Sequence, residues 1–281
     1  MMTSKEIGTL ALEAMLFEVS ATPKPGLVDR NNSGAHRDMS FFTFMESAAS
    51  LRESFEDFAE AGFNFDLSTA EAVPLRRGGV SETDRGVLQQ LFPLIRKIGI
   101  EAEKKMFKAT NGINTHKGEI FSLGLLSTCA GYLIHNGKKI TVETLTDIAK
   151  KMCSGLCGKD FSEVYSKTYD KLTKGEKVYL KYGVTGIRGE AEAGYPVVKN
   201  FALPALKKYL SEGFNINDAL AFTLIHIMAN ASDTNIISRH DIQTAEKVMT
   251  LSKKLLEKNL TLQEIYELDE KFIAENPDRV K

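Results

Sequence analysis

Four polar segments of the chain carry residue types that could bind and transform a phosphorylated ligand. Each is rich in glycine, asparagine, threonine, aspartate, histidine or arginine, and each adjoins stretches with helical, apolar spacing. Such connections carry function more often than helix interiors do, because their backbone groups and short polar side chains are free to meet a ligand. The segments are residues 22–38, 110–119, 184–196 and 232–241.

The first segment reads TPKPGLVDRNNSGAHRD. Prolines on both sides of Lys24 stiffen the backbone and hold the lysine ammonium group at a defined place. Arg30 and His36 are further phosphate partners, and Asp29 offers the hard oxygen ligands that Mg²⁺ prefers. A solvated loop of turn residues would have the same composition and is the alternative interpretation.

The second segment reads TNGINTHKGE and leads directly into an apolar helical pattern. Asn114 or Thr115 could cap that helix, which would place a positive dipole end beside His116 and Lys117. A helix N-terminus with an adjacent lysine can bind an anionic phosphate, although the spacing is not that of a P-loop. A simple cap beside a surface histidine is the alternative.

The third segment reads VTGIRGEAEAGYP, with glycines on both sides of Arg188 that let the backbone approach a ligand closely. In an extended chain Glu190 and Glu192 would share a side and could reach one cation. In a helix the two side chains would diverge by about 200°. The sequence leaves both arrangements open.

The fourth segment places Asp233, Thr234 and Asn235 shortly before Arg239. These residue types can hold a hydrated Mg²⁺ ion or orient a sugar hydroxyl group. They can equally cap a helix, which is the commonest reason for such residues.

The elements that must position these segments are helices. Strand signals are scarce, because no stretch combines sustained alternation with β-branched residues and a tight glycine turn. We therefore predict an all-α fold: a single domain over residues 1–281, built as a multi-helix bundle with the site formed by the inter-helix connections. The predicted helices cover residues 4–20, 41–61, 88–108, 117–135, 142–152, 204–210, 217–229, 239–256 and 262–274.

Composition excludes several classes of protein. The 281 residues include 36 Lys and Arg against 37 Asp and Glu, which argues against a nucleic-acid-coating protein. The longest apolar runs are about half of what a membrane-spanning helix needs, so no membrane partner is expected. No secretory signal is evident, and an odd number of cysteines (three) suits reduced thiols, so we expect a cytoplasmic protein.

Common catalytic motifs are absent from the sequence: it contains no GxSxG, HExxH or GxGxxG. The four polar segments together suit a phosphorylated ligand carried with Mg²⁺. The residues by themselves therefore predict an enzyme that acts on a nucleotide or a sugar phosphate.

Within these segments the sequence resembles the triphosphoribosyl-dephospho-coenzyme A synthase family, which serves citrate lyase and malonate decarboxylase. The matching stretches, which span residues 22–239, are TPKPGLVD with GAHRDM, IGIEAEKKM leading into TNGINTHKGEIFSLG, GIRGEAEAGYP, and DTNIISR. The family often continues the last motif with paired glycines, where this chain has His240 and Asp241.

The resemblance implies a pentosyltransferase that uses ATP and 3'-dephospho-coenzyme A. The triphosphoribosyl group would move from adenine to a ribose hydroxyl of dephospho-coenzyme A, giving 2'-(5''-triphosphoribosyl)-3'-dephospho-coenzyme A and free adenine. The product is the precursor of a prosthetic group that is later placed on an acyl carrier protein of citrate lyase or malonate decarboxylase. The oligomeric state is left open, and a homo-oligomer is one alternative.

Chemical inference assigns roles to residues of the matching segments. We expect Lys24, Lys117 and Arg188 to bind the triphosphate, because cationic side chains pair with phosphate oxygens. His116 is the candidate for proton transfer, since an imidazole can change its charge near neutral pH. The other expected substrate contacts are Arg30, His36, Asn114, Thr115, Thr234, Asn235 and Arg239.

The acidic residues are divided between metal binding and catalysis. Asp29, Glu190 and Asp233 are expected to hold Mg²⁺ together with ATP. Glu119 or Glu192 would act as the base for the incoming hydroxyl or stabilise the ribosyl cation. All four segments are then expected to converge on one metal-bound nucleotide.

Two other functions fit the same residues. An all-α, Mg²⁺-dependent nucleotide hydrolase would release phosphate or pyrophosphate instead of adenine. A non-catalytic nucleotide-binding helical protein, for instance a companion of an acyl carrier protein, would bind nucleotide without turnover.

Overall fold

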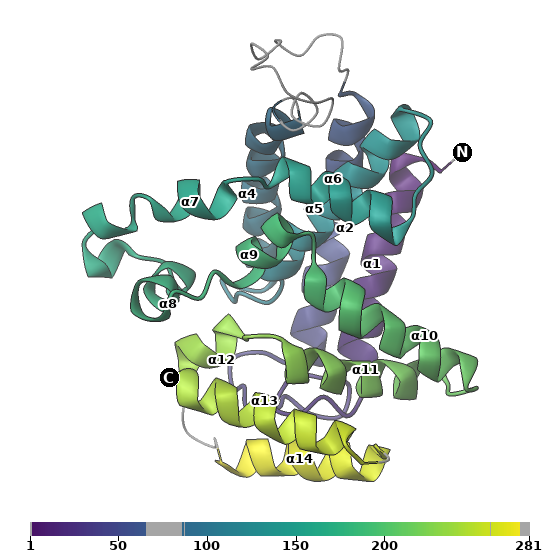
Figure 1. The fold of residues 1–281 in the computed structure, drawn as a ribbon, viewed down its shortest axis with the longest axis vertical. Coiled ribbons are helices and arrows are strands. Elements are labelled where there is room, and N and C mark those ends of the chain that lie inside the picture. The colour runs from purple at the N-terminus through teal and green to yellow at the C-terminus, as the bar shows by residue number, and fades with distance from the viewer. Residues whose placement is uncertain (1, 66–85, 87, 259, 276–281) are drawn as a thin grey trace. The chain divides into compact units, whose positions relative to one another are not determined.

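The computed structural model describes residues 2–65, 86, 88–258 and 260–275. Its regular elements are all helices, and no strand occurs in these ranges (Figure 1). The all-α fold class is therefore confirmed. Across the same ranges, no helix combines the length and the apolar character needed to cross a membrane.

The described residues divide into two compact units. The first unit comprises Met1–Leu16, Phe44–Leu156 and Ile187–Tyr195, and the second comprises Phe17–Thr43, Cys157–Gly186 and Pro196–Lys281. The chain passes between the units several times, and four of the five boundaries fall inside helices. The expectation of a single domain over residues 1–281 stays a prediction.

The first unit is built around α5, whose sequence is apolar on nearly every side, as expected of a buried helix. Ile120, Leu125 and Leu133 of α5 are at most 2% exposed, and α5 packs against both α4 and α6. The unit also contains most of α1, α2 and α9. The bounds of these elements are α1 (Ser4–Ser20), α2 (Phe41–Phe63), α4 (Leu91–Ala109), α5 (Lys117–His135), α6 (Val142–Met152) and α9 (Gly186–Ala193).

Helices α2 and α5 run in the same direction with their backbones in close contact. A Cβ atom on Gly131 of α5 would overlap the carbonyl oxygen of Ala59, and one on Gly62 of α2 would overlap that of Thr128. The Thr128 hydroxyl donates to the carbonyl oxygen of Phe58 across the same contact, at 2.9 Å. The two glycines therefore set how closely the helices approach.

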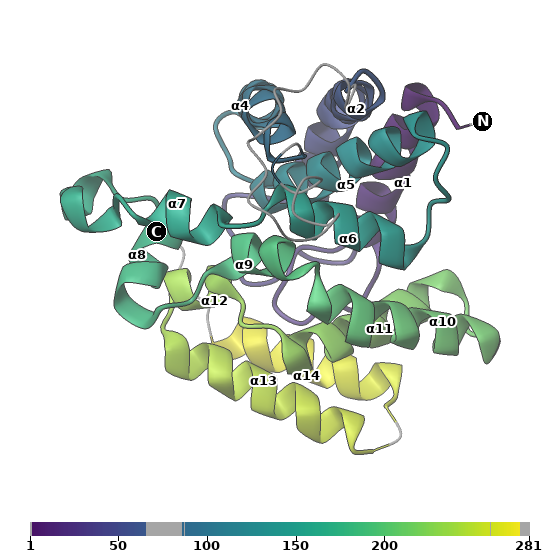
Figure 2. The same ribbon diagram turned by 45° about the horizontal axis from the view of Figure 1, so that its top comes forward.

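The second unit is built around α11 (Ile216–Asn230), another helix with apolar residues on most sides. Ala219 and Ile225 of α11 are fully buried, in one core with Ile265 of α14. Both views show α13 alongside α11 (Figure 1 and Figure 2). Helix α11 also contacts α10, α14 and the π-helix η3. The bounds of these elements are η3 (Val198–Ala202), α10 (Leu203–Ser211), α13 (Ile242–Leu256) and α14 (Leu262–Glu275).

Shorter elements complete the second unit. Helix α12 packs against α8 and α13, and η1 lies beside α8. Leu156, the first residue of α7, belongs to the first unit, and the rest of this helix belongs to the second unit. The bounds are α7 (Leu156–Phe161), η1 (Val164–Ser166), η2 (Tyr169–Lys171), α8 (Lys174–Tyr182) and α12 (Thr234–Arg239).

The helix boundaries agree with the sequence prediction where caps and apolar spacing are strong. Helices α1, α5 and α6 begin and end at the predicted residues. The prediction was wrong for residues 184–196 and 232–241, which were expected as connections but contain α9 and α12. It was also wrong in starting a helix at Arg239, because the Asp241 side chain accepts from Thr244 N at 2.7 Å and begins α13 there.

We predict that Gly131→Ala lowers the free energy of unfolding by about 1–3 kcal/mol, since overpacking a close contact forces backbone shifts. Gly118→Ala on the same helix is the matched control, because its added methyl group would meet nothing within 4 Å. That substitution should leave stability unchanged or raise it by up to about 1 kcal/mol through helix propensity. Urea unfolding of both variants tests the contrast, and equal effects would show that the two helices are not in tight contact.

Candidate functional site

The loop between α1 and α2, in the second unit, is organised around the buried carboxylate of Asp29. One oxygen, Oδ2, accepts from Thr22 Oγ1 at 2.6 Å and from Lys24 N at 3.2 Å. The other, Oδ1, accepts from Asn31 N at 2.7 Å and Asn32 N at 2.9 Å. Because four donors already surround the carboxylate, the structure shows Asp29 organising the loop. Its role as a Mg²⁺ ligand stays a prediction.

Two helices hold this loop through side chains that were not among the predicted site residues. Asn217 of α11 binds both backbone groups of Thr22, accepting from N at 3.0 Å and donating to O at 2.8 Å. Asp269 of α14 accepts from Gly26 N at 2.8 Å and from Asn32 Nδ2 at 3.1 Å. The position of the TPKPG stretch therefore depends on distant parts of the sequence.

The burial of Asp269 was detectable in principle from the sequence. It follows Ile265 by four residues and precedes Phe272 by three, so it lies on the apolar face of α14. A carboxylate at such a position needs a polar partner. Burial raises the pKa of Asp269, and the hydrogen bonds from Gly26 and Asn32 oppose that rise.

Lys24 is a buried cation. The residue is 4% exposed, and its Nζ lies 2.6 Å from Glu18 Oε1 near the end of α1. Glu18 was not among the residues predicted from the sequence. Because its carboxylate neutralises the lysine, a bound phosphate would share Lys24 with it. Arg30 lies in the same loop with an exposed side chain.

His36 and Arg239 meet although they are 203 positions apart in the sequence. The Arg239 Nη1 contacts both ring nitrogens of His36, with 3.2 Å to Nε2. Burial and, to a smaller extent, the nearby Arg239 charge lower the pKa of His36 to about 4, although Asp38 opposes both effects. The pair therefore carries the charge of one guanidinium at neutral pH, next to a neutral imidazole.

The remaining predicted residues of the second unit lie at the start of α12. Asp233 caps this helix, accepting from Asn235 N at 2.7 Å and Ile236 N at 3.3 Å. A Cβ atom on Gly186 would lie 2.8 Å from Thr234 Cγ2, so the start of the GIRGEAEAGYP stretch touches α12. The capping interpretation of Asp233 is confirmed, and its binding of Mg²⁺ stays a prediction.

In the first unit, His116 is buried at the start of α5. It is 1% exposed, and its Nδ1 lies 2.7 Å from Oγ of Ser47, a fully buried residue of α2. Thr115 Oγ1 donates to the same Ser47 oxygen at 2.7 Å. The alternative of a surface histidine is therefore wrong. Of the two predicted caps, the Asn114 side chain is the one that accepts from Lys117 N, at 3.3 Å.

Lys117 and Glu119, which follow His116 closely in the sequence, are more exposed to solvent than His116. Lys117 Nζ forms an ion pair with Glu103 Oε2 of α4 at 2.8 Å, and the Lys117 side chain is half exposed. Glu119 lies in the first turn of α5 and is partly exposed. An exposed lysine at a helix N-terminus remains suited to an anionic ligand.

Arg188, Glu190 and Glu192 all lie on α9 and are partly buried. Because this segment is helical, the two glutamate side chains diverge by about 200°, and the extended alternative in which both reach one cation is wrong. Glu192 Oε1 accepts from Gly155 N at 2.8 Å.

The described part of the chain contains no group of three or more His, Cys, Asp or Glu residues that could hold a metal ion. The four donors around Asp29 and the capping role of Asp233 agree with that finding. These side chains do not form a prepared metal site, so the set Asp29, Glu190 and Asp233 stays a prediction.

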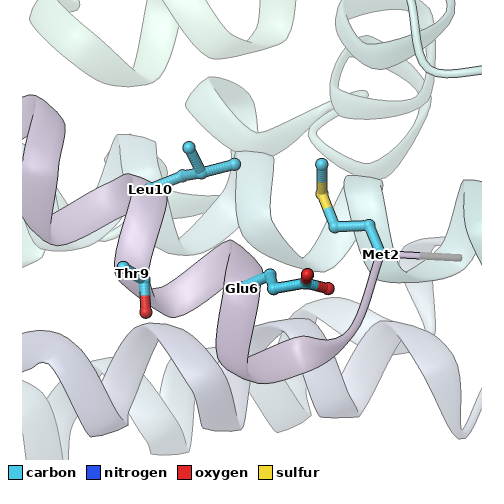
Figure 3. A pocket seen from close by; sticks show the side chains of 4 residues that line it. All are labelled: Met2, Glu6, Thr9 and Leu10. Atoms are coloured by element: carbon cyan, nitrogen blue, oxygen red, sulfur yellow. The ribbon is translucent and has the colours of Figure 1, made fainter.

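Figure 3 shows a pocket on the first turns of α1, lined by Met2, Glu6, Thr9 and Leu10. It contains none of the predicted site residues. Glu6 accepts from Thr3 N at 2.7 Å and thereby caps the helix. We assign this pocket no role.

We predict that Asp269→Ala lowers the free energy of unfolding by about 1–3 kcal/mol, because it leaves buried donors of Gly26 and Asn32 without an acceptor. Asp269→Asn keeps one acceptor oxygen and should cost less. Glu270→Ala, at an exposed neighbouring position of α14, is the control and should be close to neutral. Urea unfolding and the rate of proteolysis within the loop measure both effects, and a neutral Asp269→Ala would argue against the anchor.

The pKa of His36 predicts a pH dependence of stability. Its usual value of 6.5 falls to about 4 in the folded chain, so below pH 6.5 the unfolded chain binds a proton that the folded chain does not. Between pH 7.5 and 5.5 the wild type should therefore lose more stability than His36→Gln. Urea unfolding at both pH values tests this, and identical losses would contradict a lowered pKa.

Comparison with known proteins identifies the family. Residues 4–277 match the model of the CitG family, described as ATP:dephospho-CoA triphosphoribosyl transferase. The 2-(5''-triphosphoribosyl)-3'-dephosphocoenzyme-A synthase of Pectobacterium atrosepticum is 37% identical over 271 residues, which cover 96% of this chain and 83% of the relative.

Two further relatives agree. The enzyme of the same name from Klebsiella pneumoniae is 36% identical over 91% of this chain and 78% of its own length. The probable synthase of Lactiplantibacillus plantarum is 43% identical over 85% of this chain and 77% of its own length. No solved structure matches the chain. The match over nearly its whole length shows that the chain belongs to the CitG family of ATP:dephospho-CoA triphosphoribosyl transferases.

Proposed function

We propose that the chain transfers the triphosphoribosyl group of ATP to 3'-dephospho-coenzyme A and releases adenine. The family match over residues 4–277 is the observation that carries this conclusion. The bond that breaks joins adenine to the ribose, and the bond that forms joins that ribose to the acceptor hydroxyl. The enzyme is thus a pentosyltransferase.

The reaction makes three demands on side chains. Adenine must receive a proton as it departs, the incoming hydroxyl must lose one, and negative charge must stabilise the cation-like ribose carbon. The triphosphate also needs cationic partners. Each unit of the structure supplies groups of these kinds.

In the first unit, we assign His116 to proton transfer and Lys117 and Arg188 to phosphate binding. The burial of His116 at the N-terminus of α5 supports its role, because a low-dielectric surrounding strengthens a directed hydrogen bond. Glu119 and Glu192 remain the two candidates for the base or for the acid that stabilises the ribosyl cation.

In the second unit, Lys24 and Arg239 are assigned to phosphates, and Arg30 is a further candidate. Because His36 is neutral, its contact with Arg239 does not compensate the positive charge of the guanidinium group. That remaining charge favours an anionic ligand. Contacts with ribose or phosphate are proposed for the other polar residues of the motifs, which are Asn114 and Thr115 in the first unit and Thr234 and Asn235 in the second.

Mg²⁺ is proposed to arrive with ATP as part of the substrate. In nucleotide sites this ion is commonly held by phosphate oxygens and waters together with one or two carboxylates. Asp29, Glu190 and Asp233 remain the predicted carboxylates.

The product is proposed to serve as the precursor of the prosthetic group of citrate lyase or malonate decarboxylase, on an acyl carrier protein. We place the reaction in the cytoplasm, which suits three cysteines that form no disulfide bond, Cys129, Cys153 and Cys157.

One assay separates this activity from the alternatives. Purified protein is incubated with ATP, MgCl₂ and dephospho-coenzyme A, and the products are identified by chromatography and mass spectrometry. Adenine and triphosphoribosyl-dephospho-coenzyme A should appear in equal amounts, and omission of dephospho-coenzyme A should abolish both. Release of phosphate or pyrophosphate without adenine would show a hydrolase, and binding without turnover would show a non-catalytic protein.

For His116→Gln we predict adenine release that is slower by about 10²-fold or more, with folding and ATP binding retained, as expected on losing a general acid or base. His135→Gln, at the exposed end of the same helix, is the control and should match the wild type. Single-turnover adenine release and ATP titration measure the two quantities. Wild-type turnover in His116→Gln would remove His116 from the mechanism.

A further inference from the structure

We propose that Ser47 is a positioning residue for His116: it fixes the orientation of the imidazole ring and keeps its proton on Nε2. This inference rests on the proposed role of His116 in proton transfer. Ser47 lies outside the segments that resemble the family, and its part in the site comes from the structure alone.

The ring is held by contacts on several sides. Its Nδ1 lies 2.7 Å from Ser47 Oγ. Phe44, one turn earlier on α2, packs edge-on against the imidazole with ring centroids 4.9 Å apart and planes at 78°. The backbone N–H of His116 donates to Met106 Sδ of α4 at 3.3 Å. The ring therefore has a defined orientation, with Nδ1 toward α2.

The hydrogen bond between Ser47 and the ring is linked to which ring nitrogen carries the proton, because either Ser47 or Nδ1–H donates in it. A hydroxyl group has one proton to donate and two lone pairs that accept. Thr115 Oγ1 donates to Ser47 Oγ and occupies one lone pair. In the proposed arrangement the Ser47 proton points to Nδ1 and the second lone pair accepts nothing from the ring, so the neutral imidazole accepts at Nδ1 and carries its own proton on Nε2.

A hydroxyl partner also suits a ring that changes its charge. When His116 binds a second proton, Nδ1–H becomes the donor and Ser47 Oγ the acceptor, and the ring keeps its orientation. If the charged ring then gives its Nε2 proton to adenine, it is left neutral with Nδ1–H donating to Ser47. A carboxylate at this position would instead favour the charged form.

The resting tautomer can be measured on the wild-type protein. Long-range ¹H–¹⁵N correlation spectra of histidine-labelled protein at pH 8 distinguish protonated from unprotonated ring nitrogens, and His116→Gln identifies the His116 signals among the five histidines. We expect an unprotonated Nδ1 and a protonated Nε2. A proton on Nδ1, or a doubly protonated ring, would overturn the proposal whatever the fate of any Ser47 variant.

Kinetics test whether Ser47 acts through His116. Ser47→Ala should lower kcat for adenine release by about 10-fold or more, as for other partners that orient a functional histidine, and leave KM for ATP within about twofold. Ser54→Ala is the matched control, since Ser54 is a serine of the same helix with 1% exposure, and it should retain wild-type kcat. An unchanged kcat in Ser47→Ala would overturn the positioning role.

A double variant separates positioning from a general loss of structure. In the His116→Gln background, Ser47→Ala should cause no further fall in kcat, because the residue through which it acts is gone. An equal fall in both backgrounds would show a structural effect and contradict the proposal.

The proposed function can fail independently of this inference. Absence of adenine from the wild-type reaction would refute the activity, and wild-type turnover in His116→Gln would refute the role of His116. Neither result alters the tautomer seen in the spectra.

Discussion

The contact between the backbones of α2 and α5 is the constraint on which the surroundings of His116 depend. Three hydrogen-bonded pairs link α2 to α5 and to the two residues just before it, at sequence separations of 68 to 70, so the two helices run in register in the same direction. Gly62 and Gly131 permit van der Waals approach toward the C-terminal ends. The same approach lets the short side chain of Ser47 reach the imidazole at the N-terminal end, where a wider separation would require a longer residue.

This arrangement also explains why a polar cluster is stable inside an apolar unit. Thr115 Oγ1, Ser47 Oγ and Nδ1 of His116 are paired in a chain of short hydrogen bonds, and buried polar groups are tolerated when they are paired in this way. The surrounding core residues of α4 and α5 exclude water, which increases the strength of those bonds. Structural and chemical requirements therefore coincide at the start of α5.

Much of the fold could be predicted from the sequence, because long helices carry strong periodic signals. Helices α1, α5 and α6 were bounded correctly by their apolar spacing and end residues. Short helices such as α8, α9 and α12 have too few turns for a periodic pattern and derive much of their stability from tertiary contacts. In the candidate site, the structure brings His36 and Arg239 together, and their binding of substrate stays a prediction. Ser47 and Asp269 were missed because their partners lie 69 and 243 positions away.

The hydrogen bonds around Asp29 have a consequence for the order in which the chain acquires structure. All four donors come from residues no more than seven positions away from Asp29. Their hydrogen bonds therefore close only short loops of chain, which costs little chain entropy. The attachments to Asn217 and Asp269, by contrast, need segments made roughly 200 residues later. During synthesis the loop can therefore adopt its local shape before the ribosome has translated α11 and α14, the helices that hold it in the folded protein.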